Sequence, residues 1–522
     1  MPALGKIVFT FLAFVGAGTG CLAAPVDVAT YHNDNARTGQ NLGETVLTTS
    51  NVKSSTFGKL LTFPVDGKID AEPLYLSAVP ISGKGTHNVI YVVTENDSVY
   101  AFDADDGTLL WQVSVVGQGE TPSDDHGCGQ ISPQIGVTST PVIDRSSGAH
   151  GTIYVVAMSK NSSNYIQRIH ALDITTGQEE FGGPTEIKAT YRNGQVVFDP
   201  SQYAERQGLL LVNHVIYTAW TSHCDLGAYT GWVIGYSGST LQQTSVLNLT
   251  PSGSAGSIWQ SGAGMASDGS NIYFLDANGT FDTTLNKKGF PSLGDYGNAF
   301  VKLSTKNNKL AVADYFNMFN TVDESSKDLD LGSGGALLLP PLKDAQGKTR
   351  YLAIGAGKDT NIYIVDRLNM GKFNPNNDNA IYQEIDGVLG RGMWAMPAYF
   401  HGSVYFGPYG NHLLQFRLSK ARLSKAPVSK SKIGFHYPGS TPSVSANGAS
   451  NGIVWTIEHS LNPDVLHAYD ATNLAKELYN SNQATKRRDH FGIASHFGTP
   501  MIVNGKVYVG TENSVAVFGL LH

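Results

Sequence analysis

Short apolar stretches recur along the whole chain, and turns rich in glycine and polar residues separate them. The clearest examples are Asn88–Thr94 and Ser98–Trp111, followed by a second pair at Thr152–Val156 and His170–Phe181. They are rich in Val, Ile, Tyr and Phe, the residue types that favour strands. No stretch shows the period of a long amphipathic helix. The pattern therefore predicts an all-β protein of many short strands.

One unit repeats eight times along the chain. Each copy has a strand rich in Val, Ile and Tyr, and these strands begin near residues 88, 152, 215, 271, 361, 403, 452 and 506. A second, independent set of eight apolar strands begins near residues 72, 140, 208, 262, 335, 396, 441 and 499 and is expected to line the centre. A spacing of roughly 60 residues suits four-stranded antiparallel blades with insertions. We therefore predict a single eight-bladed β-propeller.

The last repeat lacks a strand. Thr499–Leu521 has room for only three strands, whereas Phe57–Pro64 precedes the first complete blade and has no blade of its own. We predict that Phe57–Pro64 supplies the outer strand of the last blade, so that the N- and C-terminal strands pair and close the ring. Deleting residues 50–64 should then cost far more than one strand's contacts.

The N-terminus has the pattern of a secretory signal. Lys6 precedes the apolar run Ile7–Gly16, which is shorter than the roughly 20 residues of a membrane span, and small residues follow through Ala24. We expect residues 1–24 to be a signal peptide and 25–522 to be one domain, exported to the periplasm or secreted. A lipid anchor at Cys21 is the disfavoured alternative, because Gly18 stands where such sites prefer Leu. No later segment is predicted to cross a membrane.

Composition narrows the function further. Charged residues make up 15% of the chain and the net charge is −7, which argues against nucleic acid as a partner. Removal of the signal leaves Cys128 and Cys224, and an oxidising compartment permits a disulfide between them. No Cys-x-x-Cys-His motif is present, so we expect no covalently attached haem.

Two of the repeats carry a family resemblance. Ala101-x-Asp103-x-x-Asp106-Gly107-x-x-x-Trp111 resembles the tryptophan-docking repeat of quinoprotein propellers, and Ala171 to Phe181 is the same repeat with Phe in place of Trp. Over most of residues 30–521 the chain is similar to the alcohol dehydrogenases that depend on pyrroloquinoline quinone (PQQ). The resemblance implies a propeller whose docking aromatics pack between adjacent blades, with PQQ and calcium as cofactors.

The resemblance also assigns roles to residues. Ser222-His-Cys-Asp-Leu-Gly227 and Ala277-Asn278-Gly279 are similar to the family's calcium-binding stretches, which implies that Asp225 and Asn278 are metal ligands and that Ser222 contacts the quinone. The remaining assignments are Trp259 as the floor under the quinone, Asp330 as catalytic base and metal ligand, Lys358 as a catalytic and quinone-contacting cation, and Asp70 as an acidic quinone contact. Each residue also has a structural reading, as a turn, cap or core residue.

The chain departs from the family pattern at three places. Asp225 stands where the family has Glu, Leu329 replaces a Trp, and the family's adjacent cysteine pair is absent. Only Cys128 lies at the corresponding place, while Cys224 directly precedes Asp225, so we expect a Cys128–Cys224 disulfide at the mouth of the funnel. Other residues expected at the starts of the inner strands are Glu72, Gln260, Arg391, Trp394, His436, Tyr437 and His496.

Three functions remain open from the sequence. The leading hypothesis is a PQQ- and calcium-dependent dehydrogenase of an alcohol or sugar that passes electrons to a separate acceptor. The second is a non-catalytic propeller that binds protein, peptide or glycan across its funnel. A third is a polysaccharide-active propeller that uses His or Tyr as its base.

Overall fold

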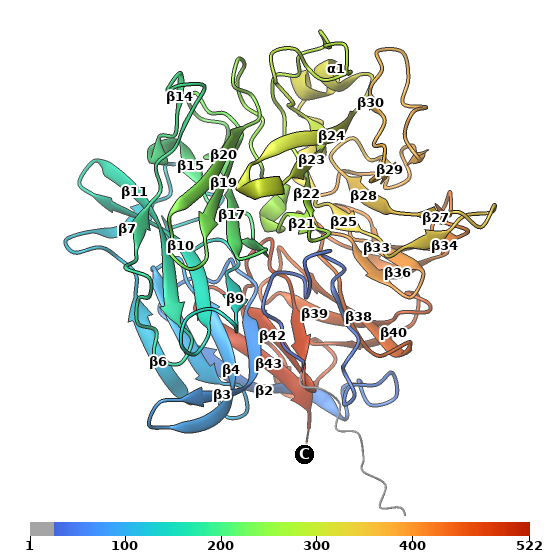
Figure 1. Cartoon of the computed structure of the whole chain (residues 1–522). Helices are drawn as coiled ribbons and strands as arrows, with labels where there is room; N and C mark the ends of the chain where they lie inside the picture. The colour runs from blue at the N-terminus through green and yellow to red at the C-terminus, as the bar shows by residue number, and fades with distance from the viewer. Residues whose placement is uncertain (1–25, 522) are drawn as a thin grey trace, which may run out of the picture.

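The computed structural model describes residues 26–521, so the predicted signal peptide and Cys21 lie outside it. Within these residues the chain is nearly all β and forms a ring of eight antiparallel blades (Figure 1). The colours in Figure 1 run in chain order around the ring, and the red C-terminal strands meet the blue N-terminal strand. The predicted eight-bladed propeller is confirmed.

Each blade contains four strands, which are named from the centre of the ring outward. Blades 1 to 4 are β3 (Leu74–Ile81), β4 (Gly85–Val93), β5 (Ser98–Asp103), β6 (Leu109–Ser114); β9 (Val142–Asp144), β10 (Thr152–Asn161), β11 (Asn164–Asp173), β12 (Thr185–Glu186); β16 (Leu210–Val212), β17 (Val215–Ala219), β19 (Trp232–Ser237), β20 (Gln243–Asn248); and β21 (Ala266–Ser267), β22 (Asn271–Leu275), β23 (Ala299–Ser304), β24 (Ala311–Asn317).

The second half of the ring has the same order. Blades 5 to 8 are β25 (Leu337–Leu338), β28 (Leu352–Ala356), β29 (Ile362–Asp366), β31 (Gln383–Ile385); β32 (Ala398–Phe400), β33 (Ser403–Phe406), β34 (His412–Ser419), β36 (Ser429–Gly434); β37 (Ser443–Asn447), β38 (Ser450–Glu458), β39 (Val465–Asp470), β40 (Glu477–Asn480); and β41 (Met501–Val503), β42 (Lys506–Gly510), β43 (Ser514–Leu520), β2 (Phe57–Pro64).

Smaller elements decorate the blades. They are β1 (Gln40–Asn41), β7 (Thr121–Asp124), β8 (Gln134–Ile135), β13 (Thr190–Tyr191), β14 (Val196–Val197), β15 (Tyr203–Ala204), β18 (Thr221–Ser222), β26 (Leu342–Lys343), β27 (Thr349–Arg350), β30 (Lys372–Phe373), β35 (Arg422–Leu423), the α-helix α1 (Thr321–Ser326) and the 3₁₀ turns η1 (Pro200–Gln202), η2 (Gln260–Gly262), η3 (Lys306–Asn308), η4 (Leu331–Ser333) and η5 (Thr485–Arg487).

The predicted inner strands are confirmed, since each begins within a few residues of its expected start. The prediction of the second strand was wrong in blade 5. The stretch from Asn361, matched by its Ile-Tyr-Ile-Val signature, forms the third strand β29, and the second strand is β28. Both are continuous apolar runs at the centre of one sheet, so composition alone does not order them.

The ring closes as predicted. β2 pairs antiparallel with β43, from Phe57 opposite Leu520 to Pro64 opposite Ser514. Phe57 is fully buried, and its ring contacts those of Trp455, Tyr479 and Phe518. The first strand of the domain therefore completes the core of the last blade.

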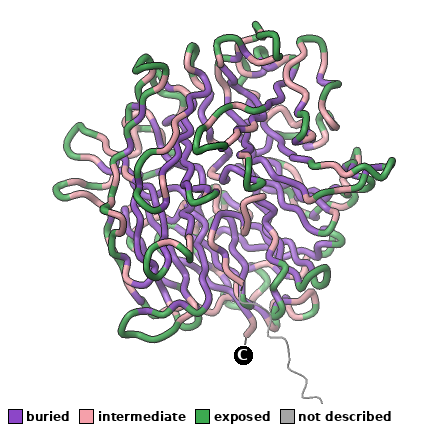
Figure 2. The backbone as a smooth tube through the Cα atoms, viewed as in Figure 1, coloured by how far each residue is buried: buried purple, intermediate pink, exposed green. Residues whose placement is uncertain are grey.

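The hydrophobic core lies between neighbouring blades. Strand residues are buried, whereas the rim loops are exposed (Figure 2). Trp111 of blade 1 shows the expected docking: its Nε1 donates to the Ile174 carbonyl oxygen of blade 2 at 3.0 Å. A Cβ on Gly177 would lie 2.8 Å from the Trp111 ring, so glycine is required at this turn.

A segment that precedes the blades ties all eight together. We call residues 28–41 the hub; they lie against the inner strands along the centre of the ring. Bonds join Val28 to Tyr75 in blade 1, Ala29 to Ile143 in blade 2, Asn35 to Leu211 in blade 3 and Ser267 in blade 4, Ala36 to Leu338 in blade 5, Thr38 to Tyr399 in blade 6, Gly39 to Val444 in blade 7, and Asn41 to Ile502 in blade 8.

Arg37 lies at the middle of the hub and is fully buried. Its Nε donates to the Met265 carbonyl oxygen at 2.8 Å, and one terminal nitrogen donates to the Tyr31 carbonyl oxygen at 2.7 Å. The other terminal nitrogen donates to the Leu209 carbonyl oxygen at 3.3 Å. All three guanidinium nitrogens are therefore hydrogen-bonded to backbone carbonyl groups within the protein.

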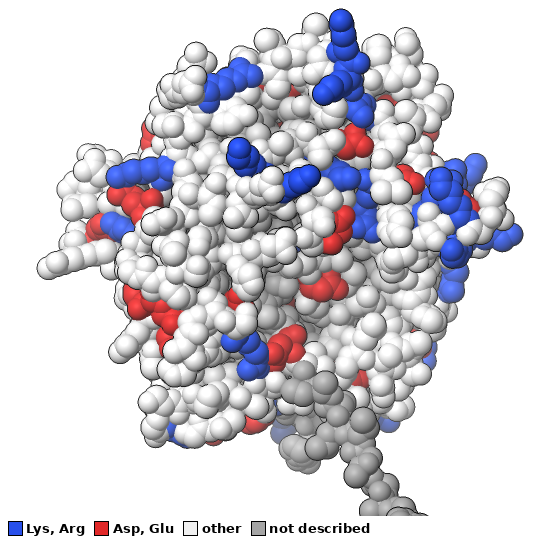
Figure 3. All heavy atoms as spheres, in the orientation of Figure 1, with Lys and Arg blue, Asp and Glu red and all other residues white. Residues whose placement is uncertain are grey.

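The surface carries few concentrated charges. On the face in Figure 3, Lys and Arg gather at one edge, over β27 and β34, while other charges are scattered. This edge contains the Lys/Arg-rich segment from Arg417 to Lys432. Among residues 26–521, no helix is long and apolar enough to cross a membrane.

Candidate functional site

Most of the predicted site residues lie on loops at the same end of the ring. In each antiparallel blade, the loop from the second to the third strand and the link to the next blade emerge on one face. The loop between the second and third strands carries Ser222 in blade 3, Asn278 in blade 4 and Lys358 in blade 5. Trp259 and Asp330 occupy links that lead into blades 4 and 5. The fold thus converts regular sequence spacing into one cluster.

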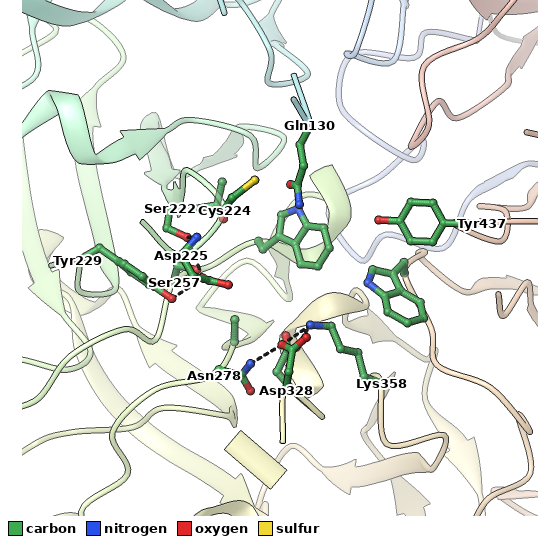
Figure 4. A pocket seen from close by; sticks show the side chains of 15 residues that line it. Gln130, Ser222, Cys224, Asp225, Tyr229, Ser257, Asn278, Asp328, Lys358 and Tyr437 are labelled. Carbon is green, nitrogen blue, oxygen red and sulfur yellow. Dashed lines mark hydrogen bonds and ion pairs between the residues drawn. The ribbon is translucent and has the colours of Figure 1, made fainter. Parts of the chain in front are cut away.

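These residues line one cavity of about 280 Å³, which we call cavity A (Figure 4). Its wall includes six of the seven predicted cofactor and metal residues, together with Trp394 and Tyr437 of the expected funnel lining. The six are Ser222, Asp225, Trp259, Asn278, Asp330 and Lys358.

Asp225 is held by a compact turn. Its backbone NH donates to Ser222 Oγ at 3.1 Å, and Ser222 Oγ donates back to Asp225 Oδ1 at 3.0 Å. The Tyr229 hydroxyl also donates to Asp225 Oδ1. Cys224 and Asp225 both have positive φ, of 49° and 58°, a conformation that is uncommon for residues other than glycine. The turn therefore fixes the carboxylate at the cavity wall.

The disulfide between Cys128 and Cys224 is present, as predicted. The Cα atoms lie 5.5 Å apart and the bridge spans 96 residues of sequence. It joins the loop between β7 and β8 to the Asp225 turn, and Cys224 itself lines cavity A. In the chain-entropy model such a loop contributes up to about 4–5 kcal/mol, whereas disulfides typically contribute about 2–4 kcal/mol.

Two histidines stack beside the disulfide. The rings of His126 and His223 are 3.9 Å apart at an interplanar angle of 10°. Burial lowers the pKa of His223 to about 4, and burial also lowers the pKa of His126. Two neutral imidazoles can stack without charge repulsion, so the pair reinforces the link that the disulfide makes.

Lys358 connects two aspartates across the cavity. Its Nζ lies 2.6 Å from Asp328 Oδ1 and 2.6 Å from Asp330 Oδ1, and 5.8 Å from the centre of the Trp259 ring. Burial raises the pKa of Asp330 to about 6, and the Lys358 ammonium limits the rise. Burial opposes the charge on Lys358, but Asp330 and Asp328 outweigh it and raise the pKa of the ammonium.

Close backbone contacts bring these loops together. A Cβ on Gly332 would lie 2.4 Å from the backbone nitrogen of Ala277, and a Cβ on Gly357 would lie 2.4 Å from the Leu331 Cα. Neither glycine leaves room for a side chain. They therefore allow the Asn278, Asp330 and Lys358 loops to touch.

Several polar atoms in cavity A lack a partner. Asn278 Nδ2 donates to Asp328 Oδ1 at 2.7 Å, but Asn278 Oδ1 accepts no hydrogen bond. Trp259 Nε1 and Asp330 Oδ2 are also buried without a hydrogen bond. Buried polar groups normally have partners, so these atoms indicate a binding site.

The cavity also has an excess of negative charge. Asp225, Asp328 and Asp330 line it against the single ammonium of Lys358, a formal surplus of two negative charges. Carboxylate and amide oxygens are the ligands that calcium prefers. Among the described residues, no group of three or more His, Cys, Asp or Glu side chains is placed to hold a metal. The described side chains do not by themselves form a complete metal site.

Asp70 lies apart from the other predicted site residues. It does not line cavity A, and its Oδ2 pairs with Lys68 at 3.0 Å. Burial opposes ionisation of Asp70, but Lys68 and Arg206 outweigh it and hold the pKa below its usual range.

The remaining expected funnel residues divide into two groups. Glu72 and Gln260 are buried and bonded to backbone: Glu72 accepts from the His32 NH at 2.7 Å, and Gln260 accepts from the Leu275 NH at 2.8 Å. Arg391 and His436 are exposed, and His496 lines a second cavity.

Sequence reasoning missed four residues of the site. Gln130, Asp328 and Tyr229 line cavity A, and Asp276 lies behind its wall, where neither carboxylate oxygen has a hydrogen-bond partner. Burial raises the pKa of Asp276 well above its usual range. In the sequence, Asp328 could have been recognised as an acidic residue two positions before Asp330, and Asp276 as one two positions before Asn278. Gln130 and Tyr229 had no local signal.

Comparisons with known proteins address the fold. No protein-family model and no curated sequence matches the chain. Among solved structures, a quinohemoprotein alcohol dehydrogenase from Comamonas testosteroni superposes with a TM-score of 0.61 at 14% identity, over 96% of this chain and 81% of that one.

Two further structures are similar. One from Pseudomonas putida HK5, also a quinohemoprotein alcohol dehydrogenase, gives 0.61 at 13% identity, over 95% and 80% of the two chains. A europium-containing methanol dehydrogenase gives 0.63 at 14% identity, over 95% and 98%. The resemblance seen in the sequence thus extends to the whole architecture, and the chain has the propeller fold of the quinoprotein alcohol dehydrogenases.

Proposed function

We propose that this protein is an exported dehydrogenase that oxidises an alcohol or sugar hydroxyl with PQQ and calcium. The observation that carries the proposal is cavity A, where six residues assigned from the family motifs converge around unpartnered polar atoms and surplus negative charge. Oxygen ligands and unpaired donors suit a cation together with a planar acid that bears carbonyl groups. A separate acceptor would take the electrons.

Each residue has a role in this proposal. Asp225 and Asn278 would hold the calcium ion through Oδ atoms, and Trp259 would provide a flat apolar surface beside the quinone. PQQ, when bound, supplies the two-electron oxidising chemistry. Lys358 would stabilise negative charge that develops next to it.

Asp330 would accept the proton of the substrate hydroxyl. A general base must be ionised at the working pH, and its pKa should lie close to that pH. Burial brings the pKa of Asp330 to about 6, so its carboxylate is mostly ionised at neutral pH and still basic enough to take a proton. The adjacent Lys358 ammonium keeps the carboxylate oriented.

The test is calorimetric titration of PQQ into the mature protein, residues 25–522, with calcium present. Binding should be lost in Asp225→Ala and retained in Asp323→Ala, a matched control in α1 where the exposed Asp323 carboxylate pairs with Lys327. Absence of quinone binding to the wild-type protein with calcium would refute the dehydrogenase proposal and favour a non-catalytic binding propeller.

A further inference from the structure

A second and larger cavity adjoins the candidate site. Cavity B measures about 630 Å³, more than twice cavity A, and its lining comes from blades 1, 2 and 8. Gln130 lines both cavities, and Figure 4 shows its side chain extending over cavity A. The loop that carries the disulfide thus forms a shared wall. A ligand longer than cavity A would meet cavity B beyond this wall.

The lining of cavity B is polar, and it carries negative charge beyond the ion pair of Lys68. Asp66 accepts hydrogen bonds from the side chains of Thr94, Asn96 and Ser98. Lys68 is paired with Asp70. Asp66 and Glu512 carry formal negative charges, so the lining disfavours an anion and suits a neutral polar ligand.

Glu95 is a buried polar group in the wall of cavity B. It is 1% exposed, and its Oε2 accepts from the Gly136 NH at 2.8 Å and from Thr138 Oγ1 at 2.9 Å. Burial, followed by the neighbouring Asp70, raises the pKa of Glu95 well above its usual range, and the Glu95 and Asp70 side chains hydrogen-bond to each other. The Glu95 carboxyl is therefore satisfied within the protein and contributes a polar wall to the cavity.

Aromatic side chains connect the two cavities along the opposite wall. The rings of Trp394, Tyr409 and Tyr437 pack edge to face at 5.7 to 5.9 Å, and the Tyr437 ring lies 6.1 Å from that of His496. Trp394 and Tyr437 line cavity A, and His496 lines cavity B. Tyr437 is 37% exposed, although burying an aromatic ring is favourable. Its ring is therefore available to stack on a ligand.

We propose that cavities A and B together bind a neutral oligosaccharide. The hydroxyl to be oxidised would lie in cavity A, while further sugar rings would stack on Tyr437 and bond to Gln130 at the wall shared with cavity B. Sugars present both hydroxyl groups, which match amide and carboxyl side chains, and apolar C–H faces, which match aromatic rings. Only the oxidation step rests on the proposed dehydrogenase function; the binding surface does not.

The experiment is calorimetric titration of neutral trisaccharides, namely cellotriose, maltotriose and xylotriose, into the mature protein without quinone. At least one should bind, and about tenfold more tightly than glucose, because only the longer chain reaches both cavities. Tyr437→Ala should weaken that binding about tenfold and Gln130→Ala about fivefold. The matched control is Tyr351→Ala: Tyr351 is 39% exposed and lines neither cavity.

The outcomes separate the two proposals. Failure of every trisaccharide to bind, or equal binding by Tyr437→Ala and Tyr351→Ala, would overturn the oligosaccharide site, even where quinone still binds. Trisaccharide binding in a protein that takes up no quinone would retain the site and refute the dehydrogenase. A simple alcohol such as 1-propanol that binds as tightly as the trisaccharides would also count against an extended site.

Discussion

The hub and cavity A both lie near the centre of the ring, yet they differ in whether their buried polar groups have hydrogen-bond partners. In the hub, Arg37 is fully buried and all three of its guanidinium nitrogens are bonded within the protein. In cavity A, Asn278, Trp259 and Asp330 bury polar atoms that have no partner. Since an unsatisfied buried group costs stability, the difference separates a structural region from a binding region.

The largest expected effect is the loss of Arg37. Arg37→Met should lower the free energy of unfolding by roughly 3–5 kcal/mol, because it leaves the Leu209 and Met265 carbonyl oxygens beside blades 3 and 4, and the Tyr31 carbonyl oxygen in the hub, without their donor. Denaturant unfolding of the variant and of Arg417→Met, an exposed control, measures the difference. Equal stability of the two variants would show that the hub does not hold the blades together.

The disulfide should contribute nearly as much. Cys128→Ser and Cys224→Ser should each destabilise the protein by about 2–4 kcal/mol, because the unfolded chain loses a cross-link of 96 residues. Thermal unfolding with and without reductant measures this. If reductant lowers the melting temperature of the wild-type protein no more than that of the serine variants, the bridge is not present in solution.

Much of this architecture could be predicted from the sequence. The eight blades, the inner strands and the closing strand Phe57–Pro64 follow from repeats, because each blade is one local unit with its own strand pattern. Trp111 was predictable for the same reason. The second strand of blade 5 was misplaced, since β28 and β29 are both apolar runs of similar length.

The hub and cavity B could not be predicted in this way. Arg37 bonds to Leu209 and Met265, which lie more than 170 residues away, and the hub has no repeating pattern to reveal such contacts. The six residues of cavity A were identified through family motifs rather than by physical pattern. Gln130 and Glu95 belong to no such motif, and only the fold places them beside the site.

Replacing Asp330, the proposed base, should reduce activity without destabilising the fold. If the proposed function holds, Asp330→Asn should reduce turnover by a factor of about 10² or more, because no group remains to accept the hydroxyl proton. Its melting temperature should stay equal or rise, since the substitution removes a buried charge whose pKa the fold raises. Measuring turnover and melting on the same sample distinguishes the two effects, and a variant that unfolds readily would show Asp330 to be structural.

The smallest effect concerns Glu95 and pH. Because the folded state raises the pKa of Glu95, it keeps a proton that the unfolded chain releases above about pH 4.5, so stability falls as pH rises beyond that point. Glu95→Gln should abolish this part of the decline and leave the variant more stable than the wild-type protein at neutral pH. Unfolding curves from pH 5 to pH 8 provide the comparison. Parallel decline in both proteins would mean that Glu95 is ionised in the folded state.

The most direct measurement is the melting temperature of the mature protein with and without PQQ and calcium. A ligand that binds only the folded state raises that temperature, so the unpartnered groups of cavity A predict a clear rise in the wild-type protein. The rise should be absent in Asp225→Ala and present in Asp323→Ala. A wild-type melting temperature unchanged by saturating quinone and calcium would contradict a cofactor site in cavity A.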